Sequence, residues 1–238
     1  PRRQFHKLRQ YWGDLSMLDW ESDEQLFSLM ADRLYSSVIS DVLDDAGYRN
    51  QVMSHKIRPL YDDAVAVGRV MTVLCMDVYE IPDQPYKMEI EAVDSLKPNE
   101  VLVCSTNGSD RYSFWGELLS TASVARGASG AIIDGFVRDC KAIMDMQFPV
   151  FATGISPLDS KGRGDVVSFN TPIECGGVRV VSGDVVFGDY DGIVVVPQQT
   201  EGQIVSAAFD KVSGENHIRQ ELKAGATVKC VFDKYGIL

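Results

Sequence analysis

Apolar residues recur at two different spacings along the chain, and the spacing separates predicted helices from predicted strands. Four of them follow one another at helical intervals near one end: Leu26, Leu29, Met30 and Leu34. Ser22 stands before them, with Gln25 three residues further on, which is a capping-box pattern. The two signals together predict a helix from about residue 23 to residue 34.

Two further helices are expected from the same kind of pattern. One follows Ser36 or Ser37, either of which suits the N-cap position, and Gly47 supplies its stop signal. A long helix is expected between Thr200 and Gly225, where apolar positions again share one face. A glycine in its middle leaves the continuity of that helix open, because glycine lowers helix propensity.

Runs rich in β-branched residues predict strands in the rest of the chain. AVAVGRVMTVLCM at 64–76 and VLVCST at 101–106 have this composition. Between 115 and 155, strand-like and helix-like stretches alternate, which is typical of parallel strands joined by helices. From 164 to 197, short β-rich runs are separated by glycine-containing turns, which favours antiparallel strands.

These elements predict an α/β fold. The chain shows no internal repeat, low-complexity tract or Pro- or Ser-rich linker that would divide it. We therefore expect an N-terminal arm at 1–20 and a single domain at 21–238. The expected architecture is a single-domain β/β/α sandwich of the swivelling type, with mixed sheets and helical termini.

Composition narrows the function classes. A hydrophobic content of 45% with 24% charged residues suits a soluble protein with a core. The net charge of -11 disfavours binding to nucleic acid, whose phosphates would be repelled, and no apolar run has the roughly 18 residues that cross a membrane. The five cysteines form no CxxC pair, so neither a zinc site nor a disulfide framework is indicated, and a cytoplasmic location fits best.

The segment from Trp115 to Asp139 carries the chemistry-bearing residues. Gly116 and Glu117 begin a predicted helix, whose free N–H groups attract anions, and Arg138 precedes Asp139 in a loop after a predicted strand. A carboxylate there can ligate Mg²⁺ or Mn²⁺, and an adjacent arginine can hold a substrate carboxylate. Each signal alone also fits an ordinary role, since acids favour the first turn of a helix and Arg-Asp pairs are common on surfaces.

Other catalytic patterns are missing from the sequence. There is no GxGxxG dinucleotide fingerprint, no P-loop and no GxSxG nucleophile elbow. The three histidines are far apart and no HExxH occurs, so zinc catalysis is disfavoured.

The run GELLSTASVARGASGAIIDGFVRD resembles the signature of the RraA-like family. That family includes metal-dependent class II 4-hydroxy-4-methyl-2-oxoglutarate aldolases and the regulator of ribonuclease E activity A. Four further stretches are similar to other parts of the family: SSVISDVLDDAG, AVAVGRVMTV, VVSGDVVFGDYDGIVVVP and GENHIRQELKAG. The resemblance covers about residues 33–225.

The resemblance implies roles for particular residues. The family's aldolase signature is an acidic residue, then twenty residues, then Arg-Asp, and Glu117 with Arg138 and Asp139 keeps this spacing. The family aldolases often have Asp at the first position, so Glu117 departs from them by one methylene. By resemblance, Arg138 contacts the substrate and stabilises the developing enolate, and Asp139 ligates Mg²⁺ (or Mn²⁺).

The resemblance also implies a binding surface and an oligomer. The backbone at the helix start would bind the pyruvate carboxylate through Gly116, Glu117, Leu118 and Leu119. Family sites lie between subunits of a homotrimer or hexamer, and a glutamate from the neighbour's C-terminal helix contributes. Glu215 matches that position, although a lone acid on a long helix also fits a solvated surface.

The function expected from the resemblance is that of a lyase. A divalent-metal-dependent pyruvate aldolase would cleave a 4-hydroxy-2-oxo acid, such as 4-hydroxy-4-methyl-2-oxoglutarate, through a pyruvate enolate. Oxaloacetate decarboxylation would follow as a side activity, because it passes through the same enolate. The alternative is a non-catalytic, protein-binding regulator of a ribonuclease, which would not need Glu117, Arg138 and Asp139 together.

Overall fold

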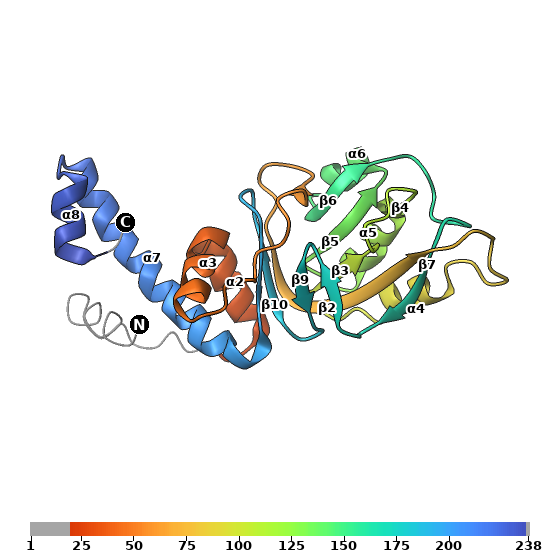
Figure 1. Ribbon diagram of the computed structural model, residues 1–238, viewed down its shortest axis with the longest axis horizontal. Coiled ribbons are helices and arrows are strands. Elements are labelled where there is room, and N and C mark those ends of the chain that lie inside the picture. Colours follow the sequence, from red (N-terminus) through yellow and green to blue (C-terminus); the bar gives the residue numbers. More distant parts are fainter. Residues whose placement is uncertain (1–19, 237–238) are drawn as a thin grey trace.

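A curled, mixed sheet forms the centre of the computed structural model, which describes residues 20–236 (Figure 1). The arm expected at 1–20 therefore lies, except for Trp20, outside the described residues. Within them the strand order is β1-β6-β5-β3-β2-β10-β11, with β4 paired to β5 and β7 paired to β2; β8 and β9 form a separate hairpin. The bounds are β1 (Arg58–Pro59), β2 (Ala66–Asp77), β3 (Glu100–Ser105), β4 (Ser113–Trp115), β5 (Gly130–Val137), β6 (Val150–Ile155), β7 (Gly164–Phe169), β8 (Ile173–Cys175), β9 (Val178–Val180), β10 (Val185–Gly188) and β11 (Ile193–Val196).

The pairing directions confirm the two halves expected from the sequence. Strands β2, β3, β5 and β6 are parallel neighbours, and β4 also runs parallel to β5. The later strands are antiparallel, since β10 pairs with both β2 and β11, and β8 pairs with β9. The sheet is therefore mixed, as predicted, and the carboxyl ends of its parallel strands point to one edge.

Helices cover the sheet on more than one side. Their bounds are α2 (Asp23–Arg33), α3 (Ser36–Asp45), α4 (Lys87–Asp94), α5 (Glu117–Ala125), α6 (Cys140–Asp145), the short 3-10 helix η1 (Gln198–Thr200), α7 (Glu201–Lys223) and α8 (Val228–Tyr235). Helix α7 continues through Gly214, which is buried. Across residues 20–236, none of these helices has both the length and the apolar character needed to cross a bilayer.

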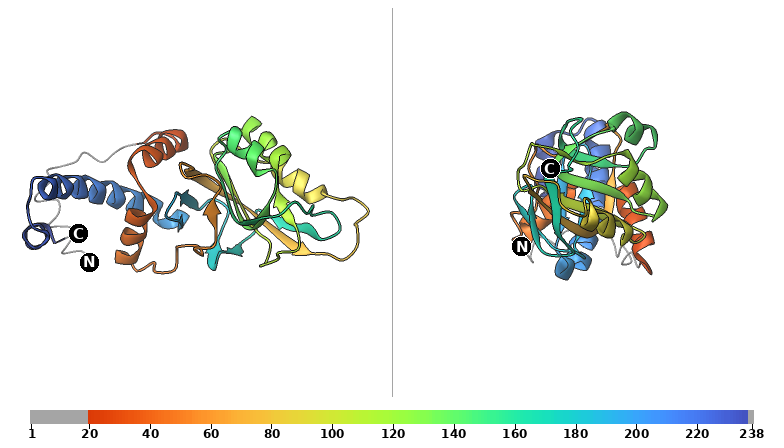
Figure 2. Two further views of the ribbon diagram at one scale, coloured as in Figure 1. Left: turned by 90° about the horizontal axis from the view of Figure 1, so that it is seen from above. Right: turned by 90° about the vertical axis from the view of Figure 1, so that its right-hand side faces the viewer.

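Three apolar clusters hold these layers together. The first lies between the parallel strands and helices α4, α5 and α6, and includes the buried residues Leu102, Ile133 and Ile143. The second joins α2, α3 and α7 to the outer face of β10 and β11. The third lies inside the curl of the sheet, beneath the β8–β9 hairpin. The resulting stack of helices, sheet and helices is visible in the left view of Figure 2.

The start of α2 is as predicted, but the start of α3 is not. Gln25 N donates to Ser22 Oγ (3.3 Å), so Ser22 caps α2 as expected; the Gln25 side chain accepts from Glu21 N (2.9 Å), the residue before the cap. Helix α3 has Tyr35 at its N-cap and Ser36 is its first residue. Neither Ser36 nor Ser37 caps it, because the cap comes from a carboxylate distant in sequence, Asp189 in the β10–β11 turn.

Candidate active site

Two turns meet at the carboxyl edge of neighbouring parallel strands. Strand β4 ends at Trp115 and β5 ends at Val137, and each is followed at once by a helix, α5 or α6. Arg138 N donates to Trp115 O (2.9 Å), which ties the second turn to the first. The structure therefore brings together the two loops that the sequence placed at strand ends.

Gly116 is the point of closest approach between the turns. Its backbone is extended (φ -153°), so the conformation does not require glycine, but the space does. A Cβ at this position would lie 2.7 Å from Asp139 Oδ2 and 3.3 Å from Arg138 Cγ. Asp139 Oδ2 accepts a hydrogen bond from Glu117 N (3.3 Å) and so occupies the N-cap place that Gly116 leaves empty.

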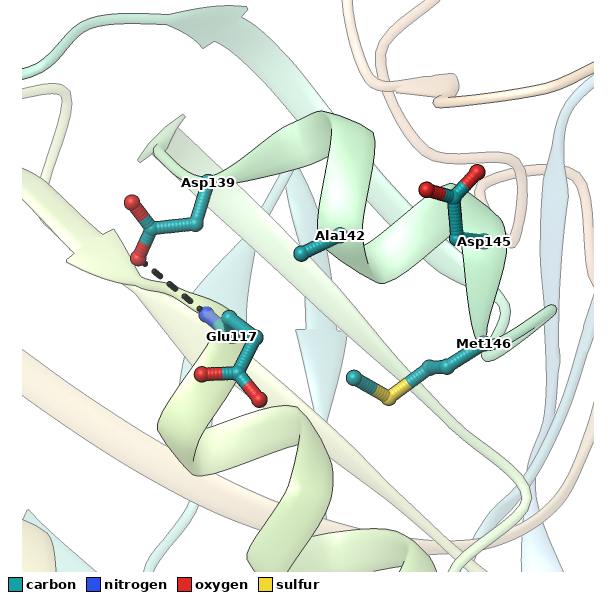
Figure 3. A pocket seen from close by; sticks show the side chains of 5 residues that line it. All are labelled: Glu117, Asp139, Ala142, Asp145 and Met146. Carbon is teal, nitrogen blue, oxygen red and sulfur yellow. Dashed lines mark hydrogen bonds between the residues drawn. The ribbon is translucent and has the colours of Figure 1, made fainter.

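Asp139 adopts the left-handed conformation (φ 56°), which aspartate tolerates better than most residues. Although it is the N-cap of α6, its side chain makes no capping hydrogen bond there and turns toward α5 (Figure 3). The side chain is 50% exposed. Its second oxygen, Oδ1, has no hydrogen-bond donor among residues 20–236 and is open to a ligand.

The Arg138 guanidinium lies between two carboxylates. Its Nε is 3.7 Å from Asp139 Oδ2, and its Nη2 is 3.2 Å from Asp159 Oδ1. In the part of the chain that the structure describes, Nη1 has no acceptor, and the side chain is 38% exposed. The free end of the guanidinium can therefore receive an anionic ligand.

Asp159 was missed by the sequence analysis. It lies in the loop after β6, the strand that pairs in parallel with β5. Its position after a neighbouring parallel strand could have marked it as a candidate for the same edge of the sheet. Tyr86 donates its hydroxyl hydrogen to Asp159 Oδ2, and Arg163 Nη1 donates to Asp159 O (3.0 Å). Burial raises the pKa of Asp159, but the Tyr86 hydrogen bond and the Arg138 charge outweigh it, so the pKa lies below its ordinary value.

Glu89 on α4 is a second carboxyl group that the sequence did not indicate. Burial, reinforced by the charges of Asp159 and Asp165, raises its pKa to about 8. Glu89 is thus close enough to Asp159 and Asp165 for their negative charges to raise its pKa. The positive charge of Arg138 lowers that pKa, but by less than the other effects raise it.

The first turn of α5 borders a shallow hollow (Figure 3). Its lining consists of Glu117, Asp139, Ala142, Asp145 and Met146. The Glu117 carboxylate accepts a hydrogen bond from Thr121 Oγ1 (2.8 Å), which lies one turn further along α5. This bond fixes the orientation of the carboxylate. Leu118 is 77% exposed, whereas Leu119 packs against the core. Solvent and small ligands can therefore reach the helix start.

Glu215 lies elsewhere in the chain. It is on α7, which leads away from the sheet on the side opposite α5 and α6 (Figure 1). Its carboxylate accepts a hydrogen bond from the Tyr35 hydroxyl of the same chain. A single chain thus brings Glu117, Arg138 and Asp139 together but not Glu215.

The donor set suits only a loosely held cation. Among residues 20–236, no three His, Cys, Asp or Glu side chains are grouped closely enough to hold a metal ion. Asp139 nevertheless offers one free carboxylate oxygen beside a solvent-accessible hollow. Mg²⁺ commonly binds through one or two carboxylates, several waters and substrate oxygens, so these residues fit Mg²⁺ or Mn²⁺ held together with a substrate.

Comparison with known proteins assigns the family. The family model described as "RraA-like: Aldolase/RraA" matches residues 36–195. The chain belongs to the RraA-like family.

Individual relatives agree with this assignment. The chain is 30% identical over 176 residues to "Putative 4-hydroxy-4-methyl-2-oxoglutarate aldolase" of Halalkalibacterium halodurans, covering 74% of this chain and 79% of that protein. It is 26% identical over 200 residues to Protein DlpA of Legionella pneumophila, covering 84% of this chain but spanning only 32% of the length of DlpA. The structure superposes on Streptomyces coelicolor RraAS2, described as an unusual member of the RNase ES inhibitor RraA protein family. That match has a TM-score of 0.75 and 26% identity, and covers 84% of this chain and all of that one.

Proposed function

We propose that the protein is a divalent-metal-dependent pyruvate aldolase acting on a 4-hydroxy-2-oxo acid, such as 4-hydroxy-4-methyl-2-oxoglutarate, with oxaloacetate decarboxylation as a side activity. One observation carries the proposal: Asp139 Oδ2 accepts a hydrogen bond from Glu117 N at the start of α5 and lies 3.7 Å from Arg138 Nε, so these three residues meet at one edge of the sheet. Relatives named for this aldolase activity, at about 30% identity, support it.

The chain offers two kinds of donor to a 2-oxo acid. The first N–H groups of a helix have no acceptor within the helix, and in α5 only that of Glu117 is taken, by Asp139. The N–H groups of Leu118 and Leu119 are left to bind the substrate carboxylate, favoured by the helix dipole. Arg138 Nη1 then stands ready for the oxygen of the 2-oxo group or for the carboxylate.

The reaction places negative charge where these groups can stabilise it. The bond between C3 and C4 breaks, its electron pair passes into the 2-oxo group to give the pyruvate enolate, and the 4-hydroxyl loses its proton and becomes a carbonyl. A divalent cation, when bound at Asp139, supplies Lewis-acid stabilisation of that charge. Arg138 adds a fixed positive charge, and a water ordered by Glu117, or by Glu215 of a neighbouring chain, accepts the hydroxyl proton. Protonation of the enolate at C3 then gives the pyruvate that is released.

An assay of pyruvate release tests the proposal. It compares 4-hydroxy-4-methyl-2-oxoglutarate, 4-carboxy-4-hydroxy-2-oxoadipate and oxaloacetate, each with Mg²⁺ and with EDTA. We expect turnover that EDTA abolishes and Mg²⁺ restores. The variant Arg138→Ala should lower kcat/KM by about 10²–10⁴-fold while its circular dichroism stays that of the wild type. Absence of metal-dependent turnover on all three substrates would contradict the proposal.

A second candidate function is binding to a ribonuclease as a regulator. The structural likeness to a member of the RNase ES inhibitor family and the net charge of -11 favour it. Such a role depends on surface charge rather than on the α5 opening. Inhibition of a ribonuclease that Arg138→Ala leaves unchanged, in a protein without pyruvate-releasing activity, would favour the regulator.

A further inference from the structure

A tyrosine and an aspartate from two separate loops converge on the guanidinium of Arg138. Tyr86 is the N-cap of α4, and Asp159 lies in the loop after β6. The Tyr86 hydroxyl donates to Asp159 Oδ2, while Asp159 Oδ1 contacts Arg138 Nη2 at 3.2 Å. Each Asp159 oxygen therefore has a different partner, and the carboxylate cannot rotate without losing one of them.

The backbone conformation of Tyr86 and further contacts of Asp159 help to fix this arrangement. Tyr86 holds the left-handed conformation (φ 65°), which is unfavourable for a bulky residue, and its side chain is thereby directed at Asp159. On the other side, Arg163 Nη1 donates to Asp159 O (3.0 Å), and Ser113 forms a parallel bridge with Asp159. Strained residues of this kind persist where surrounding contacts fix them, often at functional sites.

The protonation states support the direction of the hydrogen bond. Burial and the neighbouring Asp159 raise the pKa of Tyr86 to about 12, so the hydroxyl keeps its hydrogen at neutral pH. The pKa of Asp159 lies below its ordinary value, so the carboxylate is ionised and can hold the guanidinium. At neutral pH the Tyr86 hydroxyl therefore donates its hydrogen to the Asp159 carboxylate, and the negatively charged carboxylate attracts the Arg138 guanidinium.

The contacts also select which donors of Arg138 remain for a ligand. Asp139 lies near Nε and Asp159 lies near Nη2, on the same edge of the planar guanidinium. Among the described residues no acceptor meets Nη1. The guanidinium is planar and its donors are fixed relative to one another. Contacts at Nε and Nη2 therefore also fix the direction of the Nη1 donor.

We propose that Asp159, oriented by the Tyr86 hydroxyl, is a positioning residue that fixes the Arg138 guanidinium beside the start of α5 and leaves its Nη1 donor for the anion bound there. The inference deepens the aldolase proposal and rests on it for the identity of the anion. It adds two residues from loops outside the Trp115–Asp139 segment. Neither residue contacts the reacting atoms, so each acts only through Arg138.

The test uses oxalate, a planar dianion that mimics pyruvate enolate, and measures its dissociation constant with Mg²⁺ by calorimetry on the full chain. We expect Asp159→Asn to raise the oxalate Kd about tenfold, and Tyr86→Phe to raise it by a smaller factor. Asp159→Glu, which keeps the charge, should recover part of the loss. With substrate, the same order should appear in kcat/KM.

A matched control is available in the chain. Asp77 pairs with Arg111 at 3.1 Å, with side-chain exposures of 30% and 36%, close to the 33% and 38% of Asp159 and Arg138. Asp77→Asn removes an ion pair of similar length and exposure and should leave the oxalate Kd unchanged. Equal effects of Asp77→Asn and Asp159→Asn would overturn the proposal.

A double-mutant cycle separates positioning from general loss of structure. If Asp159 acts through Arg138, then adding Asp159→Asn or Tyr86→Phe to Arg138→Ala should weaken oxalate binding no further. Undiminished effects in the Arg138→Ala background, or a wild type that binds no oxalate, would overturn the positioning role. Failure of the aldolase assay with the oxalate cycle intact would instead remove the proposed reaction and leave the positioning role standing.

Discussion

At the scale of single residues, Gly116 is under a steric rather than a conformational constraint. Its φ of -153° is open to any residue, but a Cβ would lie 2.7 Å from Asp139 Oδ2. Gly116→Ala should therefore push the Asp139 carboxylate away from Glu117 N and lower kcat/KM by about tenfold or more, since small misplacements are costly in catalysis. Because Asp139 is half exposed, the melting temperature should change little.

Steady-state kinetics and a thermal melt of Gly116→Ala check this expectation. Gly192→Ala is the matched control, because a Cβ there meets nothing within 4 Å. Full activity of Gly116→Ala would show that the tight contact with Asp139 is irrelevant to turnover.

Glu89 gives a prediction about pH and stability. Burial, with the charges of Asp159 and Asp165, raises its pKa from 4.5 to about 8 in the folded chain. Between these values the folded state holds a proton that the unfolded state has lost. The contribution of Glu89 to stability is therefore full below about pH 4.5 and is lost as pH rises through about 8.

The variant Glu89→Gln stays neutral at every pH and should remove this dependence. Its melting temperature should match that of the wild type near pH 5 and exceed it at pH 8–9, the range about the raised pKa. Parallel melting curves for the two proteins across pH 5–9 would show that Glu89 is not held protonated by the fold.

At the scale of elements, α3 depends on a cap from another part of the chain. Asp189, in the β10–β11 turn, accepts hydrogen bonds from Ser36 N (2.8 Å) and Ser36 Oγ (2.6 Å), and also from Asp191 N (3.0 Å). Asp189→Ala should lower the free energy of unfolding by about 1–2 kcal/mol, the usual loss for an N-cap. Urea denaturation measures it, with the exposed Asp62→Ala as control; equal midpoints for the two variants would contradict the capping role.

The same helix shows where sequence reasoning stops. Local signals were enough for α2, because Ser22 and Gln25 cap it from within four residues. They failed for α3, because its cap lies 153 residues away in sequence. Helix α8 was also missed.

The candidate site divides in the same way. The spacing from Glu117 to Arg138 and Asp139 marked one strand–turn–helix unit, and the structure brings these residues together. Asp159 and Tyr86 carry no local motif and become neighbours of Arg138 only when β6 pairs with β5 and α4 packs nearby. Contacts that form only when distant strands pair cannot be predicted from a short stretch of sequence.

At the scale of the whole molecule, the site in one chain is open on the side of the hollow. Leu118 at the helix start and Ile155 at the end of β6 are large apolar residues exposed by 77% and 67%. Meanwhile Glu215 sits on α7, away from α5 and α6 (Figure 1). We propose a homotrimer or hexamer in which Glu215 of a neighbouring chain approaches the opening beside Arg138.

Subunit mixing tests that arrangement. Arg138→Ala and Glu215→Gln should each lose most activity as pure oligomers. If the two residues come from different chains at each site, hetero-oligomers of the two variants contain some sites with both native residues. Co-expression with two different affinity tags, followed by sequential purification, should therefore give oligomers that regain part of the wild-type pyruvate release.

A second pair of variants provides the control. Arg138→Ala and Asp139→Ala alter residues contributed by the same chain, so their hetero-oligomers contain no intact site and should stay inactive. Recovery in the first pair and none in the second is the expected pattern, because only the first pair distributes its defects over the two sides of the interface. Failure of the first pair to recover, or full activity of Glu215→Gln alone, would confine Glu215 to its observed contact with Tyr35.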